Sequence, residues 1–193
     1  MQVVTLGTFS TFFSMQEFVI LVDSKDRAIG TMEKMEAHKK GSLHRAFSVF
    51  LFNSRGETLM QKRASTKYHS PLLWTNSCCS HPRSGETTIE AARRRIEEEL
   101  GVSLCISDLK EEFSFTYEAE FDNGLKEHEF DHVFSAKANN CNFNLNKSEV
   151  DDIKWISLEE LFDEVNKFPQ NFTEWFKIIL KNYQNHFSYE SNS

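Results

Sequence analysis

The segment TIEAARRRIEEEL (residues 88–100) constrains the fold of this chain more than any other feature. Gly101 follows it as a helix stop, and its apolar side chains recur at the spacing of one helix face, at Ile89, Ala92, Ile96 and Leu100. Segments that alternate between apolar and polar residues lie on both sides of it, as is typical of strands. A helix between strands covers a sheet, so we expect an α+β domain with a mixed sheet.

The expected strands fall into two groups. Before the helix, residues 18–23 form a strand, and residues 44–53 and 58–64 form a hairpin around the turn SRG. After the helix, EEFSFTYEAEF and EHEFDHVFSAKA pair around the turn DNG, and IKWISL is a further strand. Ser157 and Glu160 form a capping box for a helix over LEELFDEVN. A last amphipathic helix carries the apolar residues Phe172, Trp175, Phe176, Ile179 and Leu180.

Length and composition limit the organisation and the partners of the chain. Its 193 residues suffice for one domain with a real core. We place this domain at residues 15–183, with residues 1–14 as a disordered leader and residues 184–193 as a polar tail. The net charge of −7 argues against nucleic-acid and membrane binding, and no apolar run is long enough to cross a bilayer. Nothing marks secretion or an obligate protein partner, so we expect a cytoplasmic protein with reduced thiols.

Two adjacent cysteines, Cys78 and Cys79, allow several interpretations. On a strand they point to opposite faces, and a disulfide between them would be strained. The C-x-x-C pairs of a thiolate zinc site do not occur in the sequence. Cys79 shares its expected face with His81. Cys79 is therefore either a small buried apolar residue or a thiol that faces a functional site, while Cys78 packs in the core.

The sequence also offers donors for metals and phosphates. Glu127 and Glu129 lie two apart in a strand, so both face one way. They face solvent, or they bind a divalent ion of octahedral tendency together with the histidines His38, His44 and His81. Glu98 and Glu99 lie one turn beyond two arginines on the helix. They form ion pairs on a solvated face, or a carboxylate binds Mg²⁺ beside an arginine that binds phosphate, with further charge from Arg63 and Lys67.

The helix and the residues before it resemble the Nudix box, Gly-x5-Glu-x7-Arg-Glu-U-x-Glu-Glu-x-Gly-U, in which U is aliphatic. The matching positions are Ser80, Glu86, Arg94, Arg95, Ile96, Glu98, Glu99, Gly101 and Val102. Ser80 replaces the first glycine, and Arg95 replaces the glutamate on which Nudix hydrolases rely for metal-assisted attack by water. An arginine there binds an anion instead of a metal, which argues against hydrolysis.

Four other stretches resemble one branch of this superfamily, the type 1 isopentenyl-diphosphate isomerases. They are LHRAFSVFLFN, WTNSCCSHP, FTYEAEFDNGLKEHEFDHVF and TEWFKIIL, and the resemblance covers residues 18–180. The family interconverts isopentenyl and dimethylallyl diphosphate for isoprenoid biosynthesis, by protonation of an alkene to a tertiary carbocation and loss of a neighbouring proton. The resemblance implies one compact domain with a Nudix-type mixed β-sheet flanked by helices.

The resemblance also implies site residues. The catalytic set is the thiol of Cys79, the carboxyl of Glu129, Tyr117 and the cation-stabilising ring of Trp175. One tightly bound divalent ion (Mn²⁺, Zn²⁺ or Mg²⁺) is expected on His38, His44, His81, Glu127 and Glu129. Glu99 is expected to hold a Mg²⁺ that bridges to the diphosphate, whose oxygens bind Lys34, Arg63, Lys67 and Arg95. Two alternatives are a Nudix diphosphohydrolase of the same fold and a catalytically silent metal-binding or protein-interaction module.

Overall fold

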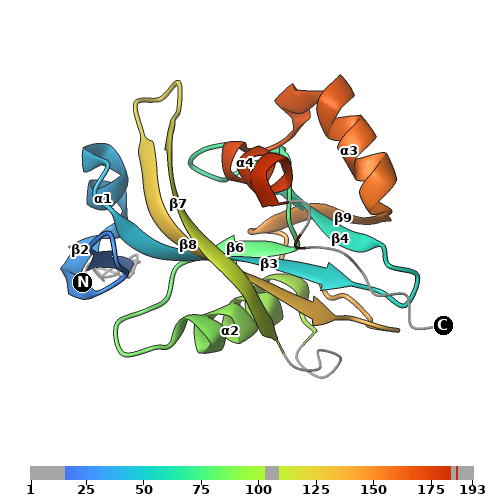
Figure 1. Cartoon of the computed structure of the whole chain (residues 1–193), viewed down its shortest axis with the longest axis horizontal. Coiled ribbons are helices and arrows are strands. Elements are labelled where there is room, and N and C mark those ends of the chain that lie inside the picture. The colour runs from blue at the N-terminus through green and yellow to red at the C-terminus, as the bar shows by residue number, and fades with distance from the viewer. Residues whose placement is uncertain (1–15, 103–108, 184–185, 187–193) are drawn as a thin grey trace, which may run out of the picture.

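The computed structural model describes residues 16–102, 109–183 and 186. The predicted leader, residues 1–14, lies outside the described residues, as does the predicted tail apart from residue 186. In the described parts, the strands form one nine-stranded mixed sheet, and helices cover both of its faces (Figure 1). The expected α+β class, with a mixed β-sheet flanked by helices, is therefore confirmed.

The elements follow one another as strands, helix, strands and helices. The strands are β1 (Phe18–Val22), β2 (Ala28–Glu33), β3 (His44–Phe52), β4 (Thr58–Arg63), β5 (Trp74–Thr75), β6 (Cys78–Ser80), β7 (Lys110–Glu120), β8 (Lys126–Lys137) and β9 (Val150–Ile156). The helices are α1 (Lys34–Lys40), α2 (Thr88–Leu100), α3 (Leu158–Lys167) and α4 (Glu174–Tyr183), with a short 3-10 turn at Pro169–Asn171. Among the described residues, no helix is long and apolar enough to span a membrane.

The centre of the sheet is β3, whose side chains are nearly all buried. It pairs in parallel with β8 and antiparallel with β6. A continuous apolar strand like this suits a sheet that is covered on both faces. Its successive side chains enter opposite layers, so that Val49 packs with α2 and Phe50 packs with α4. The same alternation applies to β6: Cys78 lies in the layer below α2, and Cys79 packs against the other layer, so their predicted facing is confirmed.

The predicted hairpin of β3 and β4 is wrong beyond its turn. The two strands meet at one register pair, Phe52 and Thr58, and then separate, because β4 takes β9 as its partner. The hydroxyl of Ser77 lies between them, where it accepts from Leu51 N at 2.8 Å and donates to Leu59 O at 2.7 Å. A side chain thus replaces the direct backbone ladder. This separation lets β6 lie beside β3 and brings Cys79 toward the space above the sheet.

Three features of the fold position the residues discussed below. The segment α1 was not predicted; it has only seven residues, and the carboxylate of Glu33 caps its first turn. Helix α2 begins at a capping box formed by Thr87 and Glu90 and ends at Gly101, whose φ of 69° is in the left-handed region that glycine favours. The long hairpin of β7 and β8 closes around its predicted turn, and its register sets Tyr117 opposite Glu129.

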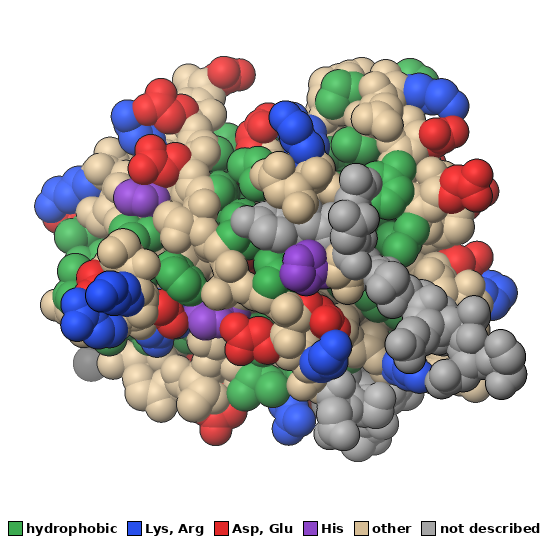
Figure 2. Space-filling view, viewed as in Figure 1, with side chains coloured by type: hydrophobic (Ala, Val, Ile, Leu, Met, Phe, Trp, Pro, Cys, Tyr) green, Lys and Arg blue, Asp and Glu red, His purple; other side chains and the backbone are tan. Residues whose placement is uncertain are grey.

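Charged side chains of both signs are interspersed over the face of the molecule shown in Figure 2. On that face, the described lysines and arginines do not gather into one broad basic stripe. A stripe of that kind is the electrostatic footprint of a nucleic-acid-binding protein. The four basic residues that the sequence assigned to a diphosphate, Lys34, Arg63, Lys67 and Arg95, line one cavity.

Candidate active site

A cavity of about 70 Å³ lies above β3, β6 and β8, and most of the predicted site residues line it. The predicted residues in its wall are Lys34, Arg63, Lys67, Cys79, His81, Arg95, Tyr117, Glu127, Glu129 and Trp175. His38 and His44 are fully buried, and both rings contact the ring of His81. These two histidines and Glu99 are the predicted residues that the wall lacks, and Glu99 lies behind the guanidinium of Arg95.

Four of the predicted metal ligands form one tight group, which we call the metal cluster: His38, His44, His81 and Glu129. One donor atom from each lies within 4.8 Å of all the others. The backbone brings them together, because His44 and Glu129 are register partners in the parallel pairing of β3 and β8. His81 directly follows β6, and His38 comes from α1.

The imidazoles of the cluster are oriented as ligands. Nδ1 of His38 bonds to Lys34 O at 2.7 Å, and Nδ1 of His44 bonds to Ser42 O at 2.8 Å. Since a carbonyl accepts, both Nδ1 atoms carry the proton and both Nε2 atoms present a lone pair. Nε2 of His38 is buried without a hydrogen-bond partner among the described residues. A metal ion would satisfy this nitrogen.

Distances within the cluster fit a divalent ion. His44 Nε2 lies 3.2 Å from His81 Nε2, and Glu129 Oε1 lies 2.9 Å from His81 Nε2 and 3.4 Å from His44 Nε2. Donor atoms bonded to one ion at ~2.0–2.1 Å stand roughly 3.0–3.4 Å apart. Burial also lowers the pKa of His81 to about 3 and lowers that of His38, which keeps both imidazoles neutral. The residues therefore fit the metal that the sequence predicts.

Glu127, the fifth predicted ligand, stands beside the cluster. The hydroxyl of Tyr117 lies 2.9 Å from Glu127 Oε2 and 2.7 Å from Glu129 Oε2, so it links the two carboxyls. Burial and the charge of Glu129 raise the pKa of Glu127 well above its usual range. Burial would raise the pKa of Glu129 as well, but its contacts with the imidazoles of His44 and His81 outweigh burial and hold this pKa well below its usual range. The pKa values of the two carboxyls are therefore shifted in opposite directions.

Sequence reasoning missed His69. Its Nε2 lies 3.2 Å from Glu127 Oε1, its ring stacks on Phe121, and its edge meets Trp175. With His38 and Glu127 it forms a second group whose donor atoms lie within 4.8 Å of one another. The only signal in the sequence was its position two residues after Lys67, which was itself expected at the site.

Cys79 and Trp175 line the same cavity on the side of α4. Burial raises the pKa of the Cys79 thiol to about 12, so the thiol keeps its proton at neutral pH. Trp175 is 3% exposed, and its indole N–H donates to Asn76 Oδ1 at 3.3 Å. The guanidinium of Arg63 lies 5.2 Å from the centre of the indole ring. Arg63 also donates to the carbonyl of His69, and thereby supports the loop that carries Lys67.

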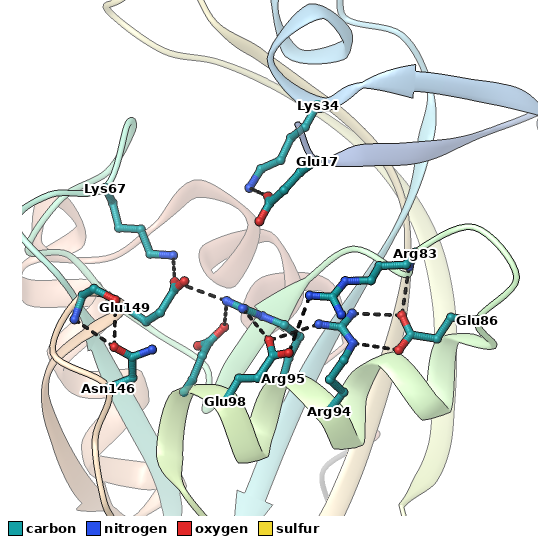
Figure 3. A network of polar contacts seen from close by, with 12 residues as sticks. Glu17, Lys34, Lys67, Arg83, Glu86, Arg94, Arg95, Glu98, Asn146 and Glu149 are labelled. Atoms are coloured by element: carbon teal, nitrogen blue, oxygen red, sulfur yellow. Dashed lines mark hydrogen bonds and ion pairs between the residues drawn. The ribbon is translucent and has the colours of Figure 1, made fainter. Parts of the chain in front are cut away.

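The wall of the cavity also includes a group of charged residues that we call the ion-paired rim: Glu17, Lys34, Lys67, Arg95 and Glu149. In Figure 3 the carboxylate of Glu149 lies between Lys67 and Arg95 and contacts both, at 3.2 Å from Arg95 Nη2. Lys34 donates to Glu17 at 2.7 Å. Arg95 Nη2 also donates to Glu99 Oε1 at 2.5 Å. Each of the rim cations that the sequence assigned to a diphosphate therefore has a carboxylate partner.

This sheet and helix α2, which carries most of the Nudix-box positions, together with metal-type donors and basic side chains around one cavity, define a Nudix-class protein. The NUDIX domain model matches residues 42–176. A crystal structure from Deinococcus radiodurans has a TM-score of 0.69 at 21% identity and covers 86% of this chain and 99% of its own. The MutT protein from Methanosarcina mazei has a TM-score of 0.60 at 16% identity and covers 76% of this chain and 96% of its own. At these identities the likeness shows the fold alone.

Curated relatives narrow this class. Isopentenyl-diphosphate Delta-isomerase 2 from Aromatoleum aromaticum is 48% identical over 166 residues, which cover 86% of this chain and 86% of the relative. Isopentenyl-diphosphate Delta-isomerase from Serratia proteamaculans is 46% identical over 171 residues, which cover 86% and 91%. The chain therefore belongs to the isopentenyl-diphosphate Delta-isomerase family, and the resemblance seen in the sequence is confirmed.

Proposed function

We propose that this protein is an isomerase that interconverts isopentenyl and dimethylallyl diphosphate in isoprenoid biosynthesis. Relatives of that name at 46–48% identity support the proposal. The observation that carries it is the make-up of one cavity wall, which combines a buried thiol, two carboxyls linked by a tyrosine hydroxyl, and an indole ring. We further propose a cytoplasmic location and action without nucleic acid, membrane or an obligate protein partner.

Moving a double bond requires one proton to be added and another to be removed. An alkene is a poor base, so the proton donor must be held close to it and water must be kept out. The thiol of Cys79 and the carboxyl of Glu129 line the same cavity and would be the two proton-transfer partners; burial raises the pKa of the thiol, and the pKa of Glu129 is lowered. Tyr117 would stabilise the carboxylate through its hydrogen bond.

The tertiary cation formed between the two proton transfers needs an electron-rich neighbour. The face of Trp175 offers one through cation–π attraction. The guanidinium of Arg63 already lies 5.2 Å from the centre of this ring, and Arg63 lines the same cavity. Arg63 then acts as a support for the ring and the loop, in addition to the diphosphate contact expected from the sequence.

Two metal ions belong to the proposal. One tightly bound divalent ion, Mn²⁺, Zn²⁺ or Mg²⁺, would be held by the metal cluster and Glu127. Mg²⁺ would accompany the diphosphate near Glu99, and Lys34, Lys67 and Arg95 would bind the diphosphate oxygens. When bound, the ions supply positive charge that stabilises the ionised carboxylate and the phosphate oxygens.

The box helix argues against the diphosphohydrolase alternative. Glu86 and Glu98 are paired with Arg94, and Glu99 is paired with Arg95. In the part of the chain that the structure describes, both groups with metal-ligand geometry lie outside this helix. Arg95, which stands in place of the glutamate on which Nudix hydrolases rely, pairs with Glu98 and Glu99, and this substitution argues against metal-assisted hydrolysis.

The reaction can be tested by incubating the purified protein with isopentenyl diphosphate and Mg²⁺ in deuterated water, followed by NMR. We expect an allylic product that has incorporated deuterium. Release of inorganic phosphate or diphosphate without the allylic product would instead establish a hydrolase. Binding of the substrate with neither outcome would favour the silent binding module.

A further inference from the structure

Glu149, which the sequence analysis did not single out, lies where the diphosphate is expected. Its carboxylate contacts two cations assigned to the diphosphate, Lys67 and Arg95 (Figure 3). Glu149 lines the cavity, whereas Glu99, the residue expected to hold the bridging Mg²⁺, does not. Both oxygens of Glu99 already accept hydrogen bonds, from Arg95 and from Gln61. An incoming ligand would therefore meet the carboxylate of Glu149 and not that of Glu99.

We propose that Glu149 makes the cavity selective for a diphosphate complexed with a divalent cation, and against the free diphosphate. The inference rests on the proposed function, because the ligand is the diphosphate of the substrate. The proposal assigns to Glu149 a specificity role that Glu99, the Nudix-box carboxylate expected to hold Mg²⁺, does not provide.

The electrostatic reason follows from competition for the same donors. A free diphosphate is a polyanion that must contact Lys67 and Arg95, and Glu149 is already within contact distance of both. The three side chains are largely buried, with 14–23% of their surface exposed, so solvent screens the repulsion between the two anions weakly. A divalent ion between Glu149 and the phosphate oxygens replaces this repulsion with attraction, since hard cations bind carboxylate and phosphate oxygens together.

The backbone keeps Glu149 in place when a ligand arrives. Its N–H donates to Asn146 O at 2.9 Å, and its C=O accepts from Ala64 N at 3.0 Å, at the start of β9. Asn146 N in turn donates to Glu99 O at 2.9 Å, which ties this turn to the end of α2. The carboxylate can rotate about its side-chain bonds, but the main chain cannot carry it away from the rim. A free anion would therefore always share the rim with this charge.

Glu17, the other carboxylate of the rim, is a weaker candidate. Its side chain is 67% exposed, and among the described residues it forms an ion pair with Lys34 only. Water and salt screen a charge that is exposed to this degree. The discrimination should consequently depend on Glu149.

The test is calorimetric titration of the full-length protein, as purified, with inorganic diphosphate, in Mg²⁺-free buffer and in saturating Mg²⁺. The variants are E149Q and E149A, which remove the charge, and E149D, which keeps it. D151N is the matched control, because Asp151 is a carboxylate on β9, two residues after Glu149, that pairs with Lys62 and does not line the cavity. We expect the unmodified protein and D151N to bind at least ~10-fold more tightly with Mg²⁺ than without it.

In E149Q and E149A this preference should fall by ~10-fold or more, because the free diphosphate gains affinity and its Mg²⁺ complex loses a ligand. E149D should keep most of the preference. An unchanged preference in the neutral variants, or an equal loss of affinity for both forms, would mean that Glu149 only positions Lys67 and Arg95, and the inference would be overturned. If the unmodified protein binds diphosphate in neither buffer, the proposed function itself fails, whatever the variants do.

Discussion

The metal cluster reaches the cavity through His81 and Glu129, and the ion-paired rim lines the same cavity, yet the chain places their side chains in different ways. In the cluster, backbone carbonyls orient His38 and His44, and strand register sets His44 beside Glu129. In the rim, long side chains hold one another, as Lys67 and Arg95 hold Glu149. The donors of the cluster are therefore in position before a ligand arrives, whereas the pairs of the rim must open to admit one.

The size of the cavity agrees with this difference. Its volume of about 70 Å³ is well below the roughly 300 Å³ at which small-molecule pockets begin. A second hollow of about 340 Å³ shares the walls formed by Lys34, His81 and Arg95. We thus expect changes near the cluster to affect the chemical step or the resident ion, and changes at the rim to affect substrate binding.

The largest effect is expected at Cys79. Cys79→Ala should lower kcat by roughly 10²–10⁴-fold while the fold persists, because it removes a proton-transfer group. Cys78→Ala is the control, since Cys78 faces the core below α2 and should affect stability and not turnover. Isomerase assays and thermal melts measure both quantities. Loss of activity in the Cys78 variant alone would reverse the facing of this pair.

The next effect concerns the resident ion. His81→Ala should remove the tightly bound metal, because His81 contacts both His44 and Glu129 in the cluster. His128→Ala is the matched control: it lies between Glu127 and Glu129 on β8 but bonds to Gly41 O on the other face. Elemental analysis of the purified variants measures the metal content. Full occupancy in the His81 variant would contradict the cluster as the metal site.

Kinetics of variants at Trp175 and Arg95 distinguish residues that act in the chemical step from residues that bind the substrate. Trp175→Leu should lower kcat by an amount equivalent to about 2 kcal/mol, while Trp175→Phe keeps part of the effect, because a benzene face still attracts a cation. Arg95→Ala should mainly raise KM, because the diphosphate is alike in substrate and transition state. Steady-state kinetics decide this. A pure KM effect at Trp175 together with a pure kcat effect at Arg95 would contradict the assignment of Trp175 to the chemical step and of Arg95 to substrate binding.

The smallest effect is expected outside the cavity, at the pair of Glu86 and Arg94. A bidentate hydrogen bond from Arg94 lowers the pKa of Glu86 from its ordinary value of 4.5. The resulting stability is present above pH 4.5 and is lost as pH falls through the lowered pKa of the folded state. Glu86→Gln should therefore reduce the free energy of unfolding by about 1 kcal/mol at pH 7 and by progressively less below pH 4.5.

Denaturant titrations of the Glu86 variant at several pH values test this expectation. Glu97→Gln is the control, because Glu97 lies on α2 with Arg94 and its replacement changes a carboxylate without removing the pair of Glu86 and Arg94. A loss of stability that is constant from neutral to acidic pH would indicate a packing effect instead of an ion pair. Turnover should stay unchanged in both variants.

Local patterns in the sequence predicted most elements of the fold. The spacing of Ile96 and Leu100, with Gly101 after them, was enough to define α2, and alternation was enough to separate Cys78 from Cys79. The partners of the strands could not be predicted in this way. The hydroxyl of Ser77, between β3 and β4, decides that they separate, and nothing local marks that serine.

At the site, too, the sequence did not predict which distant segments come into contact. The residue types and their motifs pointed to His81 and Glu129 before their distance was known. The resemblance could not reveal contacts made by residues outside its motifs. His69 reaches Glu127 through a loop, and Glu149 reaches Arg95 from the start of β9. Both contacts depend on how distant segments fold together, which periodicity does not encode.

The parallel pairing of β3 and β8 has a consequence for folding kinetics. Ser48 and Asp131, which join these strands by a hydrogen bond, are 83 positions apart, so a long loop must close before the pairing forms. Such non-local pairings form slowly. His44 and Glu129 meet only when this loop has closed, so a chain in which it is open has no cluster to offer an ion. Metal loading would then follow folding, and the apparent stability of the protein would rise with the concentration of free metal.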